Sequence, residues 1–190
     1  MNIVVRRFLS WIIDMMIIFL ILLIINPLLP ANQYEIEFTN INEQYFEKRI
    51  DSKEYLKEYI EAIHNIDKAN LAKNIVMTTL LILTFIIVPN LHNGQTIGQK
   101  LLKLKTVRKD KKNLQIEDLI FRSVIINGLG YMLFMFIILY LVPNNIYFIL
   151  ISLFGFFQII VAIISGFMIL YKKDHEGLQD LFTNTQIERS

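Results

Sequence analysis

The residue best suited to chemistry in this chain is Asp14, a carboxylate within the apolar run from Phe8 to Ile25. Because an unpaired carboxylate in hydrocarbon is costly, Asp14 should face another helix or a water-filled cavity. Two roles follow from this placement. In the structural role, an ion pair with Arg7 or Arg122 neutralises the carboxylate. In the functional role, Asp14 alternates between binding a proton and binding a monovalent cation, which requires access to water.

Four apolar runs must position these side chains. Hydrophobic residues make up 54% of the chain, more than an ordinary soluble domain carries. Each run is long enough to cross a bilayer as a helix, at about 1.5 Å of rise per residue. The runs cover residues 8–29, 75–91, 119–142 and 146–171. The sequence therefore predicts an all-α membrane protein with four transmembrane helices, of which the second is the shortest.

Three uncharged polar residues are predicted at the depth of Asp14, namely Thr84, Asn127 and Ser165. Successive spans alternate in direction, so each of these residues lies roughly five to nine residues, or about 8 to 13 Å, from the cytoplasmic end of its span. Arg122 enters the bilayer from the same side. We expect one polar layer, and a complete pathway would be easier to build from two copies of the chain.

The distribution of charge between the loops predicts the orientation. Residues 92–118 carry seven basic and three acidic residues, and the N-terminus and the tail at 172–190 are basic near the spans. Cytoplasmic loops are enriched in Lys and Arg, so these three segments are expected in the cytoplasm. Residues 30–74 and the uncharged turn at 143–145 are then expected outside. The first run is too long for the core of a signal peptide and no cleavage site follows it, which indicates a retained helix.

The outer segment at 30–74 is predicted to contain an amphipathic helix. Asp51 and Glu54 have the spacing of a helix-capping pair, and apolar residues then recur at helical spacing up to Ile66. With no Gly or Pro between Ala31 and Val88, this helix could run unbroken into the second span. Before it, alternation from Tyr34 to Thr39 predicts a short extended stretch. The helix has two interpretations, a solvated helix resting on the membrane or a binding lid.

The inner loop contains a motif made of Gly94, Thr96, Gly98 and Lys100. These residues do not make a phosphate-binding loop, because the glycines are too close together and no Ser or Thr follows Lys100. We expect the glycines to turn the chain after the second span. Ile97, Leu101 and Leu104 then predict a short helix in the inner headgroup layer, where anionic lipid would attract the neighbouring lysines.

Several kinds of site are excluded or not expected. The chain has no cysteine, which excludes disulfides, thiol catalysis and zinc sites built on sulfur. His64, His92 and His175 lie in separate segments, so no metal site is expected. No nucleophile and base pair is recognisable, and we therefore expect neither an enzyme nor a bound cofactor. Nucleic acid is not an expected partner.

Three separated motifs resemble the RDD family of bacterial membrane proteins. They are Arg7 with Asp14, the run Gly94-Gln95-Thr96-Ile97-Gly98-Gln99-Lys100-Leu101-Leu102 followed by Arg122, and Leu178-Gln179-Asp180 with Thr185. The family is named for an arginine and two aspartates, which fall here on Arg7, Asp14 and Asp180. The resemblance implies a single RDD-like domain over residues 1–190, in the cell membrane of a bacterium. Transport is the role usually proposed for the family, and sodium-proton exchange is suggested for some members.

The chain departs from the family pattern at three positions. Ser10 stands where alanine is usual, Gln179 replaces a common histidine, and Asn184 replaces a common glycine. The second departure leaves no imidazole beside Asp180, which argues against a proton relay at that position. The insertion at 30–74 also exceeds what the family core requires.

The tail is predicted to fold back against the helices. Gly177 permits a turn after the last span, and Leu178, Leu181 and Phe182 supply an apolar stripe. This would bring Asp180 to the cytoplasmic mouth, where Arg7, Arg122 or the loop lysines could meet it. The other interpretation is a disordered charged tail.

We therefore expect an integral membrane protein that transports a monovalent cation or a small solute, with cation/proton exchange at Asp14 as the specific form. The alternative is a non-transporting scaffold or assembly factor that binds lipid or a membrane-protein partner. Ala162 and Gly166 have the spacing at which helices approach closely, so a homo-oligomer is a further expectation.

Overall fold

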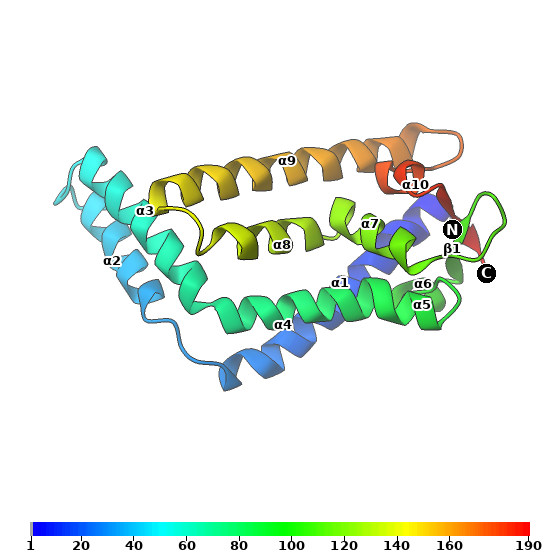
Figure 1. Ribbon diagram of the computed structural model, residues 1–190, viewed down its shortest axis with the longest axis horizontal. Coiled ribbons are helices and arrows are strands. Elements are labelled where there is room, and N and C mark those ends of the chain that lie inside the picture. The colour runs from blue at the N-terminus through cyan, green and yellow to red at the C-terminus, as the bar shows by residue number, and fades with distance from the viewer. Residues whose placement is uncertain (1) are drawn as a thin grey trace.

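The computed structural model describes residues 2–190 as a bundle of membrane-length helices with a helical hairpin at one end (Figure 1). The bundle contains α1 (Ile3–Ile25, extended by the 3-10 turn η1, Asn26–Leu28), α7 (Ile116–Ile126), α8 (Leu129–Ile138) and α9 (Asn144–Tyr171). It also contains α4 (Leu71–Ile82), the π-helical turn η2 (Leu83–Ile87) and α5 (Val88–Leu91), which form one continuous span.

Among residues 2–190, three helices are long and apolar enough to cross a membrane by themselves, at Ile3–Leu28, Leu71–Leu91 and Asn144–Tyr171. The pair α7 and α8 passes the same test only together, with a bend of 77° between the two helices. The expectation of a continuous third helix over residues 119–142 was wrong. Gly128 has φ +80°, a left-handed conformation that interrupts a helix and that glycine adopts without steric cost.

The bend also depends on a second glycine. A Cβ on Gly130 would lie 2.8 Å from the carbonyl oxygen of Val124, so only glycine lets α8 start so close to the last turn of α7. The spans pack through small apolar clusters, such as Ile18 of α1 with Leu81 and Phe85 of the second span. Their remaining faces carry exposed apolar side chains, as lipid requires.

The segment between the first two spans is the hairpin of α2 (Tyr34–Phe46) and α3 (Ser52–Ala69). Asp51 caps α3 by accepting the amide protons of Lys53 and Glu54, as its spacing predicted. The extended stretch predicted at 34–39 was wrong. These residues are helical because α2 thereby turns its aromatic face to α3, where Tyr45 stacks on Tyr55 at 4.2 Å. Helix α3 ends before Asn70 and does not run unbroken into α4.

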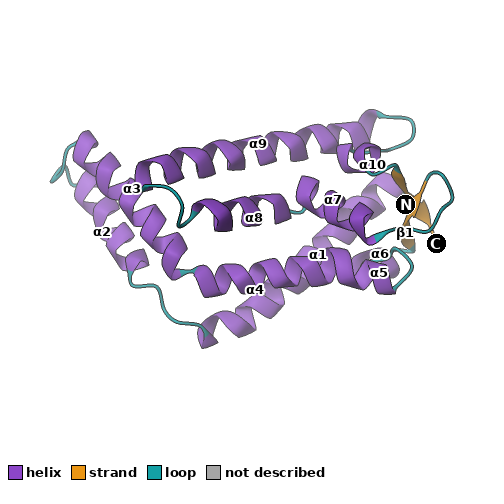
Figure 2. Ribbon diagram, viewed as in Figure 1, coloured by secondary structure: helices purple, strands orange, loops and turns teal. Residues whose placement is uncertain are grey.

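A small cap of mixed structure covers the opposite end of the bundle. It consists of α6 (Ile97–Leu101), α10 (Leu178–Phe182) and an antiparallel pair of strands, β1 (Leu104–Arg108) and β2 (Thr185–Arg189). Both chain termini lie at this end (Figure 1). Figure 2 shows the two strands against an otherwise helical molecule. The molecule is mostly helical, as the all-α fold class predicted, but the expected helical stripe was wrong at Leu104, which belongs to a strand and is fully buried there.

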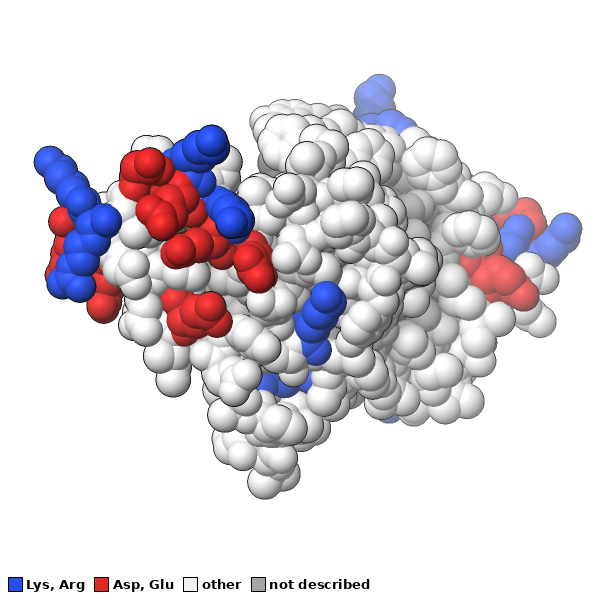
Figure 3. Space-filling view, turned by 60° about the vertical axis from the view of Figure 1, so that its left-hand side comes forward, with Lys and Arg blue, Asp and Glu red and all other residues white. Residues whose placement is uncertain are grey.

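Charge separates along the molecule in the same way. Charged side chains gather on the hairpin and again at the far end, and only a few basic side chains lie between these groups on the face that Figure 3 shows. Such a pattern is expected of a protein whose middle lies in hydrocarbon and whose ends meet water.

Candidate functional site

Asp14 lies on α1 with only 1% of its surface exposed, and its carboxylate faces the N-terminus of α6. The Thr96 hydroxyl donates to Oδ2 at 2.6 Å and the Gly98 amide donates to Oδ1 at 2.7 Å. Both donors are neutral. The expected ion pair between Asp14 and an arginine was therefore wrong, and the carboxylate is held by dipoles alone.

Two residues of the loop motif, Thr96 and Gly98, make this contact with Asp14. Thr96 and Gln99 form a capping box that starts α6, and Thr96 uses the same hydroxyl to reach Asp14. A Cβ on Gly98 would lie 2.1 Å from the carbonyl oxygen of Ser10, so only glycine allows α6 to lie against α1. The Ser10 hydroxyl donates to the Arg7 carbonyl within α1.

The other two motif residues have different roles. Gly94 has φ +82° and receives the amide proton of Thr106 on its carbonyl, which anchors the turn to β1. Lys100 is exposed on the far side of α6 and takes no part in the contact with Asp14.

Asp180 is the carboxylate that the arginines hold. Arg7 Nη2 lies 2.6 Å from Oδ2, and Arg122 Nη1 lies 2.5 Å from Oδ1. The Gly177 amide adds a third bond at 2.8 Å, and Asp180 is completely buried. Burial alone would raise the pKa of Asp180, but the Arg122 and Arg7 charges and these hydrogen bonds hold it below its ordinary value.

The tail therefore folds back, as its apolar stripe predicted. Arg7 also donates to the carbonyl of His175, and Arg122 donates to the Thr185 hydroxyl at the start of β2. The Leu178 amide donates to Ser165 Oγ at 3.2 Å. Three bundle helices, α1, α7 and α9, thus contact one short segment of the tail.

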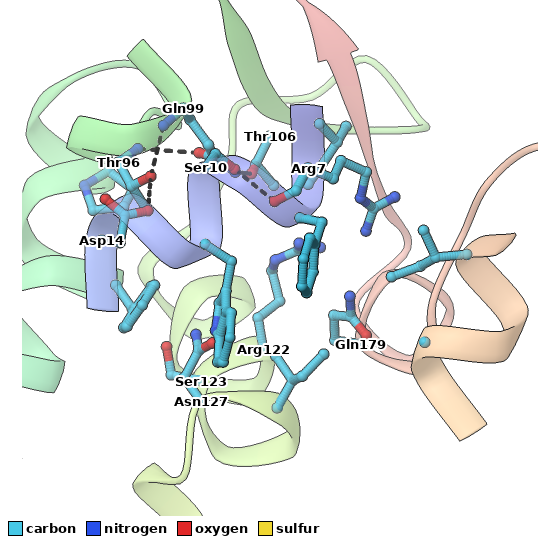
Figure 4. A pocket seen from close by; sticks show the side chains of 18 of the residues that line it. Arg7, Ser10, Asp14, Thr96, Gln99, Thr106, Arg122, Ser123, Asn127 and Gln179 are labelled. Atoms are coloured by element: carbon cyan, nitrogen blue, oxygen red, sulfur yellow. Dashed lines mark hydrogen bonds between the residues drawn. The ribbon is translucent and has the colours of Figure 1, made fainter. Parts of the chain in front are cut away.

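A cavity of about 440 Å³ lies between Asp14 and the arginines that hold Asp180 (Figure 4). Asp14 and Thr96 line one side, and Arg7, Arg122 and Gln179 line another. Its remaining wall is largely apolar and is formed by α1, η2, α7 and α9, with the residues Val4, Phe8, Trp11, Phe85, Leu119, Ile126, Ala162, Gly166, Ile169 and Leu170.

The predicted polar layer is only partly assembled at this cavity. Asn127 lines it together with Asp14. Thr84 is buried in the π-helical turn and does not line it. Ser165 lies behind the wall, where it donates to Gln179 Oε1 at 2.5 Å. Gln179 thus links α9 to the tail.

Ser123 is the lining residue that the sequence did not single out. It is 1% exposed, and its hydroxyl has no hydrogen-bond partner among residues 2–190. Its spacing gave a signal, because residues 123 and 127 lie one turn apart on one face of α7. Within the same residues, no group of three His, Asp or Glu side chains could hold a metal ion.

A family model described as the RDD family matches residues 3–184 of the chain. The chain belongs to the RDD family. No curated protein and no solved structure gave a match. In this RDD protein the arginine and the second aspartate, Arg7 and Asp180, form an ion pair, although they lie near opposite ends of the sequence. The first aspartate, Asp14, faces the loop motif at the opposite side of the same cavity.

Proposed function

We propose that this RDD protein transports a monovalent cation or another small solute across the cell membrane, with Asp14 as the group that exchanges the solute for a proton. The observation that carries the proposal is the environment of Asp14. The carboxylate is buried, has only neutral hydrogen-bond donors, and lines a cavity. A buried carboxylate without a charged partner gains most from binding a proton or a cation.

The arrangement of charges supports the same role. Both arginines, Arg7 and Arg122, form ion pairs with Asp180, so their guanidinium groups are not available to neutralise Asp14 permanently. The three charges of that cluster sum to one positive charge, which an ionised Asp14 balances across the cavity. Gain of a proton at Asp14 therefore changes the summed charge of these four groups from zero to one positive charge, and loss of that proton restores zero.

The cavity also offers a place for the solute. Ser123 Oγ, with no hydrogen-bond partner among residues 2–190, and the Asn127 side chain add polar atoms to the lining of the cavity. Oxygen atoms of this kind are what hard cations prefer as ligands. The apolar remainder of the wall would exclude bulk water and strengthen the attraction between the carboxylate and a cation.

Reconstituted protein in sealed vesicles tests the proposal. Vesicles containing a trapped pH dye are given an outward or inward gradient of sodium, lithium or potassium. We expect the gradient to drive a proton flux in the opposite direction, with a preference among the three cations. A dye signal equal to that of protein-free vesicles, for all three cations and both directions, would contradict cation/proton exchange.

The second candidate function is a scaffold or assembly factor that binds lipid or another membrane protein. The exposed apolar residues of the hairpin favour it, since Ile36 and Phe46 are 68% and 81% exposed on α2. Such a protein would be silent in the vesicle assay. We further propose that the inner cap contacts anionic lipid through Lys100 and its neighbours, and that copies of the chain form a homo-oligomer.

A further inference from the structure

The cavity that contains Asp14 presents opposite charges on two of its sides. Asp14 of α1 lines one side, and Arg7 and Arg122 line another (Figure 4). Asp180 pairs with both arginines, so the arginine side keeps one net positive charge. An ionised Asp14 balances that charge. The lining is then neutral as a whole but negative at one end and positive at the other.

Arg122 keeps hydrogen-bond donors free on the positive side. Its hydrogen bonds to Asp180 and Thr185 both start from Nη1. Its Nε and Nη2 atoms make no hydrogen bond among residues 2–190, neither atom is fully enclosed, and the side chain lines the cavity. The Nε and Nη2 edge of a guanidinium presents two parallel N–H groups, which match the two oxygens of a carboxylate.

Ser123 gives a second, independent indication of a polar ligand. Its side chain is 1% exposed and lines the same cavity, and its hydroxyl has no hydrogen-bond partner among residues 2–190. A buried hydroxyl without a partner costs free energy, which a polar atom of a ligand would recover. The Asn127 side chain lines the cavity one helical turn further along α7.

The rest of the lining is suited to an apolar segment. Phe8 and Trp11 of α1, Ile126 of α7 and Ile169 of α9 are part of it. The volume of about 440 Å³ lies within the usual range for sites that bind small organic molecules. An inorganic cation alone would leave this apolar surface uncovered and the free edge of Arg122 without an acceptor.

We infer that the cavity binds a linear organic zwitterion, with its ammonium group at Asp14, its carboxylate at Arg122 and an apolar chain between them. The inference rests on the proposed function, because the ammonium group takes the place of the proton at Asp14, and it narrows the solute to one chemical class. A ligand with both charges matches both ends of the cavity. A simple anion is repelled by Asp14, and a simple cation by the arginine side.

Three molecules with one carbon chain test the inference. The molecule ε-aminocaproate carries both charges, hexylamine carries only the ammonium group, and caproate carries only the carboxylate. Trp11 is the only tryptophan of the chain and lines the cavity, so its fluorescence in protein reconstituted into lipid nanodiscs reports occupancy of this site. We expect a saturable change with a dissociation constant for ε-aminocaproate about tenfold or more below those of both partners.

The best separation of the two charges is found with a shorter and a longer set. These are γ-aminobutyrate with butylamine and butyrate, and ω-aminocaprylate with octylamine and caprylate. Tighter binding of the zwitterion in at least one set is the expected result. The inference is overturned if, in all three sets, the amine or the acid binds as tightly as the zwitterion.

Two variants assign the two ends. In Asp14→Asn the zwitterion should lose its advantage over the acid and keep its advantage over the amine, and in Arg122→Gln the reverse should hold. Asp174→Asn, on the exposed tail, is the matched control and should keep both advantages. Advantages that persist in Asp14→Asn would overturn the inference, even if Arg122→Gln fails to fold because Asp180 has lost a partner.

Binding is measured here without transport, so the inference and the proposed function can fail separately. Proton flux driven by an alkali cation, without zwitterion binding, would overturn the inference and leave cation/proton exchange standing. Zwitterion binding in a protein that gives no such flux would support the inference and contradict exchange of inorganic cations.

Discussion

At the scale of single residues, the two family aspartates have opposite surroundings. Asp180 is held by two guanidinium groups and an amide, which makes it a fixed charge. Asp14 is held by a hydroxyl and an amide, which leaves its charge open to change. The sequence could show that both acids matter, but not which one the arginines bind. One hydrogen-bond partner of Asp14 is a backbone N–H, and a backbone donor cannot be predicted from the residue type.

The fixed role of Asp180 predicts a large loss of stability in Asp180→Asn. Removing one partner of a buried ion pair strands the others, at a cost of about 3 to 5 kcal/mol. Adding Arg122→Gln to Asp180→Asn should restore part of the loss, because one stranded charge is removed. Thermal unfolding in detergent measures both, with Asp174→Asn on the exposed tail as the control. Purely additive losses would contradict the pairing.

The lowered pKa of Asp180 also predicts how stability depends on pH. A group whose folded pKa lies below its unfolded value stabilises the protein fully above the unfolded pKa, and this contribution is lost as the pH falls through the folded pKa. The unfolding temperature of the wild type should therefore drop in acid more steeply than that of Asp180→Asn. Equal slopes would show that Asp180 is not ionised in the folded protein.

At the scale of elements, the membrane helices follow from hydrophobicity, and the places where they break do not. Asn127 and Gly128 interrupt an apolar run that contains no proline, and glycine is common within membrane helices, so nothing in the run marked the break. The pairing of β1 with β2 could not be predicted from the sequence either. The two strands are five residues each and lie on either side of two spans. The cap of α3 by Asp51, in contrast, is a local contact and was predicted.

The contact between α6 and α1 predicts a difference between two glycines. Gly98→Ala should destabilise the protein by about 1 to 3 kcal/mol, because the new Cβ would lie 2.1 Å from the Ser10 carbonyl oxygen and α6 must move. Gly166→Ala on α9 is the matched control, since its Cβ meets nothing within 4 Å. Thermal unfolding in detergent compares them. Equal effects would show that α6 does not lie tightly against α1.

At the scale of the whole molecule, the basic cap with both termini and the hairpin lie at opposite ends of an apolar belt (Figures 1 and 3). We propose that the cap is cytoplasmic, because its loop carries the excess of Lys and Arg. Exposed residues at either end test this proposal in the cysteine-free chain. Ser52→Cys should react with an impermeant thiol reagent on intact cells, and Asn113→Cys only after permeabilisation. The reverse pattern would invert the proposed topology.

The central claim is that Asp14 exchanges its proton for the transported solute. The most direct measurement compares Asp14→Asn with Asp174→Asn in the vesicle assay, since both variants replace one carboxylate by the same amide and Asp174 is exposed on the tail. Asparagine keeps the size and one acceptor oxygen, which can face the Gly98 amide, while its NH2 group can donate to the Thr96 hydroxyl, but it cannot release a proton. The account predicts that Asp14→Asn lowers the cation-driven proton flux about tenfold or more, while Asp174→Asn leaves it at the wild-type rate. Wild-type flux in folded, reconstituted Asp14→Asn protein would contradict the account.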